Sequence, residues 1–156
     1  MNTDQTELAE FLLPYATAAI GSQHPWLIAW AISKSIQESG SKRNILIISA
    51  NNCLGIKAVT GTPSFGADDS TADGRDDGAV MWRKFGSLTE CFAELVKMWN
   101  TRSFYQPARN LFVTGFENIY ADGMKEHTIS VLNKIHEVQD WLQNREGSHE
   151  RGRAIA

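Results

Sequence analysis

Apolar residues recur at helical spacing over most of the chain. This spacing predicts a first helix over residues 4–20 and a second over residues 25–38. The second segment is apolar on nearly all sides in its first two turns, which is typical of a helix buried at the centre of a domain. Helical spacing returns over residues 89–101 and 124–143, with a short helix predicted near residues 106–113. The pattern therefore predicts a mainly α protein.

The pattern changes between Gly55 and Phe85, where Gly, Asp, Thr and Ser dominate and the helical spacing disappears. Asp77-Gly78, followed by Ala-Val-Met-Trp, predicts a tight turn into a strand. We therefore expect a small β-hairpin lobe over about residues 57–85, which makes the fold class mainly α (α+β). A non-helical segment of this length inside a compact domain is more often functional than idle.

The domain organisation predicted from the pattern is simple. A chain of 156 residues suits one compact domain, and no internal repeat or linker divides it. We place that domain over residues 1–143. Residues 144–156 are polar and are expected to form a loose C-terminal tail.

Charge and hydropathy exclude some functions. The net charge of −3 and the pI of about 5.8 argue against nucleic acid as a partner, because phosphate binding needs a surface dominated by Lys and Arg. The longest strongly apolar stretch, residues 26–32, is too short for a membrane span. The polar, acidic residues 1–10 lack the features of a secretory signal peptide.

Metal and redox chemistry find little support in the sequence. The four His residues show no metal-ligand spacing, and Cys53 and Cys91 lie far apart in the chain. We expect two buried thiols, and a bridge between them stays an open alternative. The sequence shows no Gly-rich phosphate loop. It therefore predicts neither a metal nor a cofactor.

Glu38 is the first candidate for acid–base chemistry, since it closes the predicted central helix. A carboxylate there faces the negative end of the helix dipole, and partial burial also disfavours its charged form. Both effects favour the protonated carboxyl group that a general acid needs. The alternative is a solvated Glu at a helix end, which is the commonest fate of this residue type.

A second candidate group follows a dozen residues later. Asn51 and Asn52 carry amide groups that can orient sugar hydroxyl and acetamido groups, and Gly55 permits a close approach of the backbone. The alternative interpretation is an Asn-rich turn that enters a short strand.

Together, five segments in order resemble the signature of bacterial peptidoglycan glucosaminidases of the flagellar-rod and autolysin type. The resemblance spans roughly residues 25–140, and Ser41-Lys42 differs from the Trp-Gly that usually follows Glu-Ser-Gly in that family. It implies a lysozyme-like helical fold with a hairpin lobe across a substrate groove. The segments are residues 38–40 (Glu-Ser-Gly), 51–57 (Asn-Asn-Cys-Leu-Gly-Ile-Lys), 82–87 (Trp-Arg-Lys-Phe-Gly-Ser), 103–108 (Ser-Phe-Tyr-Gln-Pro-Ala) and 119–122 (Ile-Tyr-Ala-Asp).

The resemblance also implies roles for individual residues. Glu38 is expected to be the catalytic acid, and Asp73 in the hairpin lobe the second carboxylate, which guides the attacking water. Asp68 and Asp69 are alternatives to Asp73, and any of these Asp residues could instead be a solvated turn residue. Residues expected to bind the N-acetyl sugar are Asn51, Asn52, Trp82, Tyr120 and Asp69, although Tyr120 could equally pack in the core.

The function that the resemblance implies is an endo-β-N-acetylglucosaminidase that cleaves the glycan strand of peptidoglycan. Alternatives are a muramidase, a lytic transglycosylase, which needs only the acid, or an inactive wall-binding or assembly module. Without a recognisable signal, the protein is expected to reach the periplasm or cell wall by another route. A phage lysin or a delivered antibacterial effector would fit, and an effector implies an immunity protein as a partner.

Overall fold

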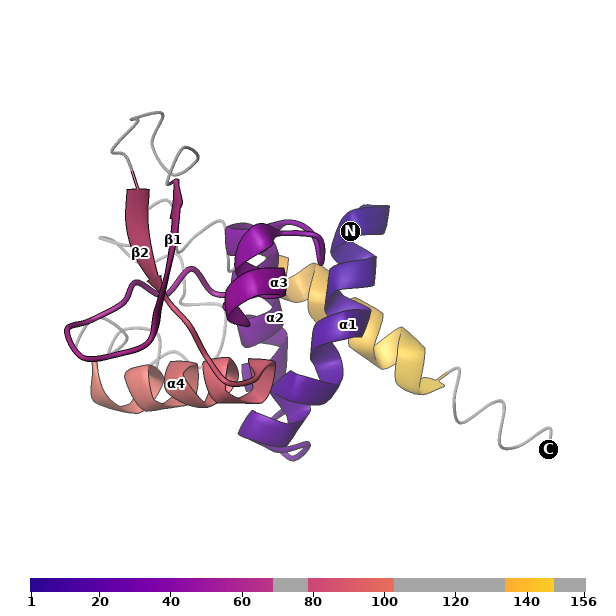
Figure 1. Cartoon of the computed structure of the whole chain (residues 1–156). Coiled ribbons are helices and arrows are strands. Elements are labelled where there is room, and N and C mark those ends of the chain that lie inside the picture. Colours follow the sequence, from indigo (N-terminus) through magenta and orange to yellow (C-terminus); the bar gives the residue numbers. More distant parts are fainter. Residues whose placement is uncertain (69–78, 103–133, 148–156) are drawn as a thin grey trace, which may run out of the picture.

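The computed structural model describes residues 1–68, 79–102 and 134–147 (Figure 1). The described chain is mainly helical and carries one two-stranded antiparallel sheet. The predicted fold class, mainly α with a small β-hairpin, is therefore confirmed. In Figure 1 the hairpin stands beside α2 and α3 with α4 beneath it, while α1 lies on the other side of α2.

Two long helices begin the chain. Helix α1 (Thr3–Ile20) starts at Asn2, whose side chain accepts the backbone N–H of Gln5 while the Gln5 side chain accepts that of Asn2. Helix α2 (Pro25–Ser39) starts with Pro25 in its first turn and ends at Gly40, which has a φ of 69°. Helix α2 buries residues on most of its circumference, so its predicted central position is confirmed.

Two shorter elements complete the helical frame. Helix α3 (Ile45–Ala50) was not predicted, because its six residues are too few to show a helical period. The Asn44 side chain accepts the backbone N–H of Leu46 at its start. Helix α4 (Leu88–Thr101) begins at Ser87, whose hydroxyl oxygen accepts the N–H of Glu90. Its Phe92, Leu95 and Trp99 face the core.

The hairpin pairs β1 (Ser64–Asp68) with β2 (Ala79–Arg83) in antiparallel register, with Phe65 opposite Trp82. The segment just before β1 also lies along β2. Lys57 bridges to Trp82, and the Arg83 N–H donates to the Ile56 carbonyl at 2.9 Å. Arg83 also forms an ion pair with Glu94 of α4 at 3.1 Å. These contacts attach the base of the hairpin to the helical frame.

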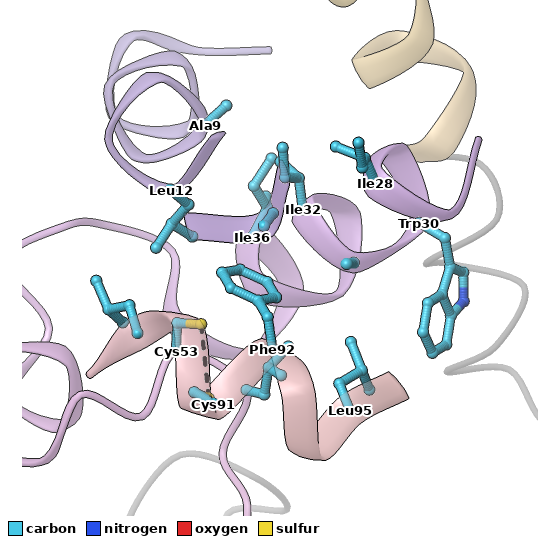
Figure 2. Packing of buried hydrophobic residues seen from close by; sticks show 14 of the residues in the cluster. Ala9, Leu12, Ile28, Trp30, Ile32, Ile36, Cys53, Cys91, Phe92 and Leu95 are labelled. Atoms are coloured by element: carbon cyan, nitrogen blue, oxygen red, sulfur yellow. Dashed lines mark hydrogen bonds between the residues drawn. The ribbon is translucent and has the colours of Figure 1, made fainter. Parts of the chain in front are cut away.

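The hydrophobic core lies between α1, α2, α4 and the helical residues 134–147 (Figure 2). Figure 2 shows Leu12, Ile32, Ile36 and Phe92 converging from three helices. Residues 134–147 add Ile135 and Val138, both fully buried.

The predicted tail boundary at residue 143 is wrong, because the helix continues to residue 147. An exposed ion pair, which a pattern of polar residues does not reveal, accompanies these last residues of the helix. The Arg145 guanidinium binds both carboxylate oxygens of Glu10 on α1 at 2.9–3.1 Å. It also lies 6.0 Å from the centre of the Trp141 ring. The polar end of this helix is thus held against α1.

Other predicted elements lie outside the described residues. They are the hairpin turn, the short helix near residues 106–113 and the first part of the last helix, from residue 124 to 133. Within the described ranges, no helix is both long and apolar enough to cross a membrane.

Candidate functional site

Glu38 lies in the last turn of α2, where several hydrogen bonds fix the helix end. The N–H of Gly40 donates to the Ile36 carbonyl at 3.0 Å. The Ser39 hydroxyl donates to the Cys53 carbonyl at 2.7 Å, and the Asn44 side chain donates to the Ser39 carbonyl at 3.2 Å. The end of α2 is therefore tied directly to the segment that follows α3.

The Glu38 carboxylate lies against Gly55. A methyl group built on the Gly55 Cα would be 3.2 Å from Glu38 Oε2 and 3.8 Å from the Trp82 ring. Gly55 has a φ of 62°, in the left-handed region that favours glycine. The side chain of Glu38 keeps 30% of its surface exposed. A partly exposed carboxylate, a bare backbone and an indole ring thus meet at the base of the hairpin.

Lys34 is a neighbour of Glu38 that the sequence reasoning missed. Its ammonium nitrogen lies 3.8 Å from Glu38 Oε1, one helical turn earlier on α2, and its side chain is only 16% exposed. Burial lowers the pKa of Lys34, and the Glu38 carboxylate opposes that shift. The four-residue spacing on a predicted helix was the signal that could have identified this pair.

Asn52 does not have the sugar-binding role predicted for it, which is a correction. Its side chain is fully buried. Its Nδ2 donates to the carbonyls of Ile56 and Arg83 at 2.8 and 2.9 Å, and its Oδ1 accepts the Ile56 N–H at 3.0 Å. The amide is therefore used inside the protein, where it closes the loop around Gly55 and fastens it to β2.

Asn51 ends α3 in the left-handed conformation, with a φ of 49°. Its Nδ2 donates to the Phe85 carbonyl at 3.1 Å, so it joins α3 to the end of the hairpin. Its side chain is partly exposed. A role in sugar binding stays a prediction for this residue.

Trp82 lies on β2, and its side chain is 8% exposed. Its ring lies near Gly55, since a Cβ added there would be 3.8 Å from the ring and 3.2 Å from Glu38 Oε2. Most of this side chain is buried, so it offers little surface to a substrate. Its role in binding also stays a prediction.

The other predicted site residues lie at or beyond the limits of the described chain. Asp68 is the last residue of β1, opposite Ala79. Asp69, Asp73 and Tyr120 lie outside the described residues. Of the predicted site residues, the structure therefore brings together Glu38 and Trp82, with Gly55 between them.

The two cysteines are buried, free thiols with their sulfur atoms 3.9 Å apart, as Figure 2 shows. The prediction of buried thiols is confirmed. The hydrogen bond with Cys53 and burial both raise the pKa of the Cys91 thiol. The Ser35 hydroxyl lies 3.6 Å from the Cys53 sulfur, within donating distance. These contacts link α2, the loop before Gly55 and α4 behind the site.

In the described ranges, no group of three His, Cys, Asp or Glu side chains is placed to hold a metal ion. Comparison with protein-family models, with curated proteins and with solved structures finds no match. The fold and site together therefore define only a class: a mainly helical protein in which a carboxylate in the last turn of a central helix lies beside the base of a β-hairpin.

Proposed function

We propose that this protein is a glycosidase that cleaves the glycan strand of peptidoglycan after N-acetylglucosamine, with Glu38 as its general acid. The observation that carries the proposal is the placement of Glu38. Its carboxylate lies in the last turn of α2, the helix with the buried body, sits beside Gly55, and belongs to a side chain that is 30% exposed. A general acid must be held in a fixed position and still be reached by the glycosidic oxygen.

The rigidity of the surroundings supports this role. The hydroxyl of Ser39, next to Glu38, donates to the Cys53 carbonyl. The Asn52 side chain closes the loop around Gly55 by two hydrogen bonds with Ile56, and it donates a third to the Arg83 carbonyl of β2. Sites held by packed helices and strands keep catalytic geometry more accurately than sites on free loops. A solvated Glu at an ordinary helix end would need no such support.

In the proposed reaction, Glu38 donates a proton to the glycosidic oxygen as the bond to the anomeric carbon breaks. Asp73, in the part of the hairpin lobe that the sequence analysis assigned to the second carboxylate, guides the water that attacks the anomeric carbon. No metal or cofactor takes part in this reaction. The hairpin stands beside α2 (Figure 1), and in this proposal it forms one wall of a groove that places the glycan across Glu38.

The direct test is Glu38→Gln, which keeps the shape of the side chain but removes its proton-donating acid. We expect the rate of peptidoglycan cleavage to fall by about 10²–10⁴-fold, the usual contribution of a general acid. Glu7→Gln is the matched control, because Glu7 is an exposed residue of α1 that pairs with Lys42. A Glu38→Gln protein that cleaves at the wild-type rate would refute the proposal.

Product analysis by mass spectrometry identifies the bond. A reducing N-acetylglucosamine end supports the proposed glucosaminidase, whereas a reducing muramic acid end indicates a muramidase and an anhydromuramic end a lytic transglycosylase. We also propose that the protein acts in the periplasm or at the cell wall. A periplasm-targeted form is then expected to lyse cells, and its Glu38→Gln variant is not.

A further inference from the structure

We infer that Gly55 is a positioning residue for Glu38: the missing side chain at position 55 lets the carboxylate lie against the backbone beside Trp82. The inference rests on the proposed function insofar as it concerns catalysis. The contact itself is a separate, measurable property. The sequence suggested that Gly55 lets the backbone approach a sugar, but the group that approaches it is the carboxylate of Glu38.

A methyl group at position 55 would make a tight contact and force a neighbour to shift by a few tenths of an ångström. At 3.2 Å from Glu38 Oε2, a Cβ at position 55 would be closer than an ordinary van der Waals contact, and the Trp82 ring would be 3.8 Å away on another side. Trp82 is held in β2 opposite Phe65 and bridged to Lys57, so it cannot easily retreat. The end of the Glu38 side chain is the most mobile of these groups, and it would move first.

The backbone at position 55 cannot move away either. The next residue, Ile56, is fixed at both polar backbone groups by Asn52, because its N–H donates to Oδ1 and its carbonyl accepts from Nδ2. Asn52 is in turn bonded to the Arg83 carbonyl. A Cβ at position 55 would therefore be accommodated by displacing the carboxylate.

Such a displacement costs little stability but much catalytic geometry. A flexible side chain that turns aside loses few contacts, whereas misplacing a reacting group by about 1 Å can cost on the order of 10²-fold in rate. Because the carboxylate has to move by only a few tenths of an ångström, we expect Gly55→Ala to lower kcat by about 3- to 10-fold, with a smaller change in KM.

Gly61 provides the matched control. It also has a positive φ, 86°, but a Cβ added there would meet nothing within 4 Å. Gly61→Ala therefore introduces the backbone strain of an L-residue in this conformation without touching Glu38. Both variants are expected to lose a similar amount of stability in urea unfolding, while only Gly55→Ala loses activity.

A second readout does not depend on activity. The ¹³C NMR signal of the Glu38 carboxyl carbon should shift in Gly55→Ala and stay in place in Gly61→Ala. If the Gly55→Ala protein does not fold, the same substitution is made in the Glu38→Ala protein, which has no carboxylate at this position. The double variant is expected to fold if the contact between the methyl group and the Glu38 carboxylate caused the failure.

The two ideas fail in different ways. A wild-type protein that does not cleave glycan refutes the proposed function. A Glu38 signal and a kcat that respond equally to both glycine substitutions, or an unfolded Gly55→Ala that Glu38→Ala does not rescue, refute the positioning role of Gly55.

Discussion

The strongest structural prediction concerns Asn52, whose side chain forms three internal hydrogen bonds. Asn52→Ala removes all three: the Ile56 N–H and the Arg83 carbonyl lose their bond to Asn52, whereas the Ile56 carbonyl keeps the Arg83 N–H. At about 1 kcal/mol of net stabilisation for each bond, the loss is about 3 kcal/mol. Domains of this size unfold at a cost of about 5–15 kcal/mol, so the loss is a large fraction of the total.

Asn51→Ala is the matched comparison, because Asn51 donates one hydrogen bond, to the Phe85 carbonyl. We expect it to cost about 1–2 kcal/mol, from that bond and from the loss of a residue type that tolerates the left-handed conformation. Urea unfolding of both variants measures the difference. Hydrogen exchange of the Ile56 amide gives a local readout, because its protection depends on Asn52 Oδ1.

The reasoning would be wrong if Asn52→Ala were no less stable than Asn51→Ala, or if the Ile56 amide kept its protection. Kinetics separate the two possible roles of Asn52. If Asn52 bound the sugar, Asn52→Ala would raise KM and leave the stability of the protein unchanged. The buried Asn52 is expected to lower stability and leave KM of the folded protein unchanged.

Two further predictions follow from burial. Burial lowers the pKa of Lys34 from 10.5, so the unfolded chain binds more protons than the folded one between the lowered pKa and 10.5, and wild-type stability rises with pH in that window. Lys34→Met is therefore expected to have a higher free energy of unfolding than wild type at about pH 7, and the difference should shrink towards pH 10.5. Urea unfolding at several pH values measures this difference, and a difference that does not change with pH would contradict the prediction. Phe92→Ala, in the core, should lower the free energy of unfolding by about 3–5 kcal/mol. Phe11→Ala should lower it by about 1 kcal/mol, because the Phe11 ring is 38% exposed and packs edge-on against Tyr15. Equal losses of stability in thermal unfolding would refute the assigned core.

The sequence predicted the helical frame well where hydrophobic spacing extends over several turns. Helix α2 was recognised because burial on nearly every side leaves a continuous apolar run. The strand β2 was recognised from the Asp77-Gly78 turn signal ahead of apolar residues. Helix α3 was missed because six residues make less than two turns, and its Ile45 and Ile48 are exposed.

Tertiary contacts explain the errors at the ends of elements. The polar residues after position 143 were predicted to form a tail, since residue type alone does not show that Arg145 forms an ion pair with Glu10 of α1. Likewise, an Asn amide has the same donors and acceptor whether it faces a sugar or a backbone. Whether Asn52 turns outward or inward depends on the position of β2, which no local pattern encodes.

The correction at Asn52 changes how the Asn-Asn-x-x-Gly segment supports a catalytic site. Sugar binding was predicted for this segment because its amides can orient sugar groups and Gly55 permits a close approach of the backbone. In the structure, Asn52 closes a rigid loop, and within that loop Gly55 provides the bare backbone on which the Glu38 carboxylate lies. Asn52 and Gly55 of this segment therefore shape the surroundings of the proposed acid, and sugar binding by Asn51 and Trp82 stays a prediction. Glu38 therefore differs from an ordinary Glu at a helix end, because its carboxylate lies beside Gly55 in a loop that Asn52 holds by hydrogen bonds.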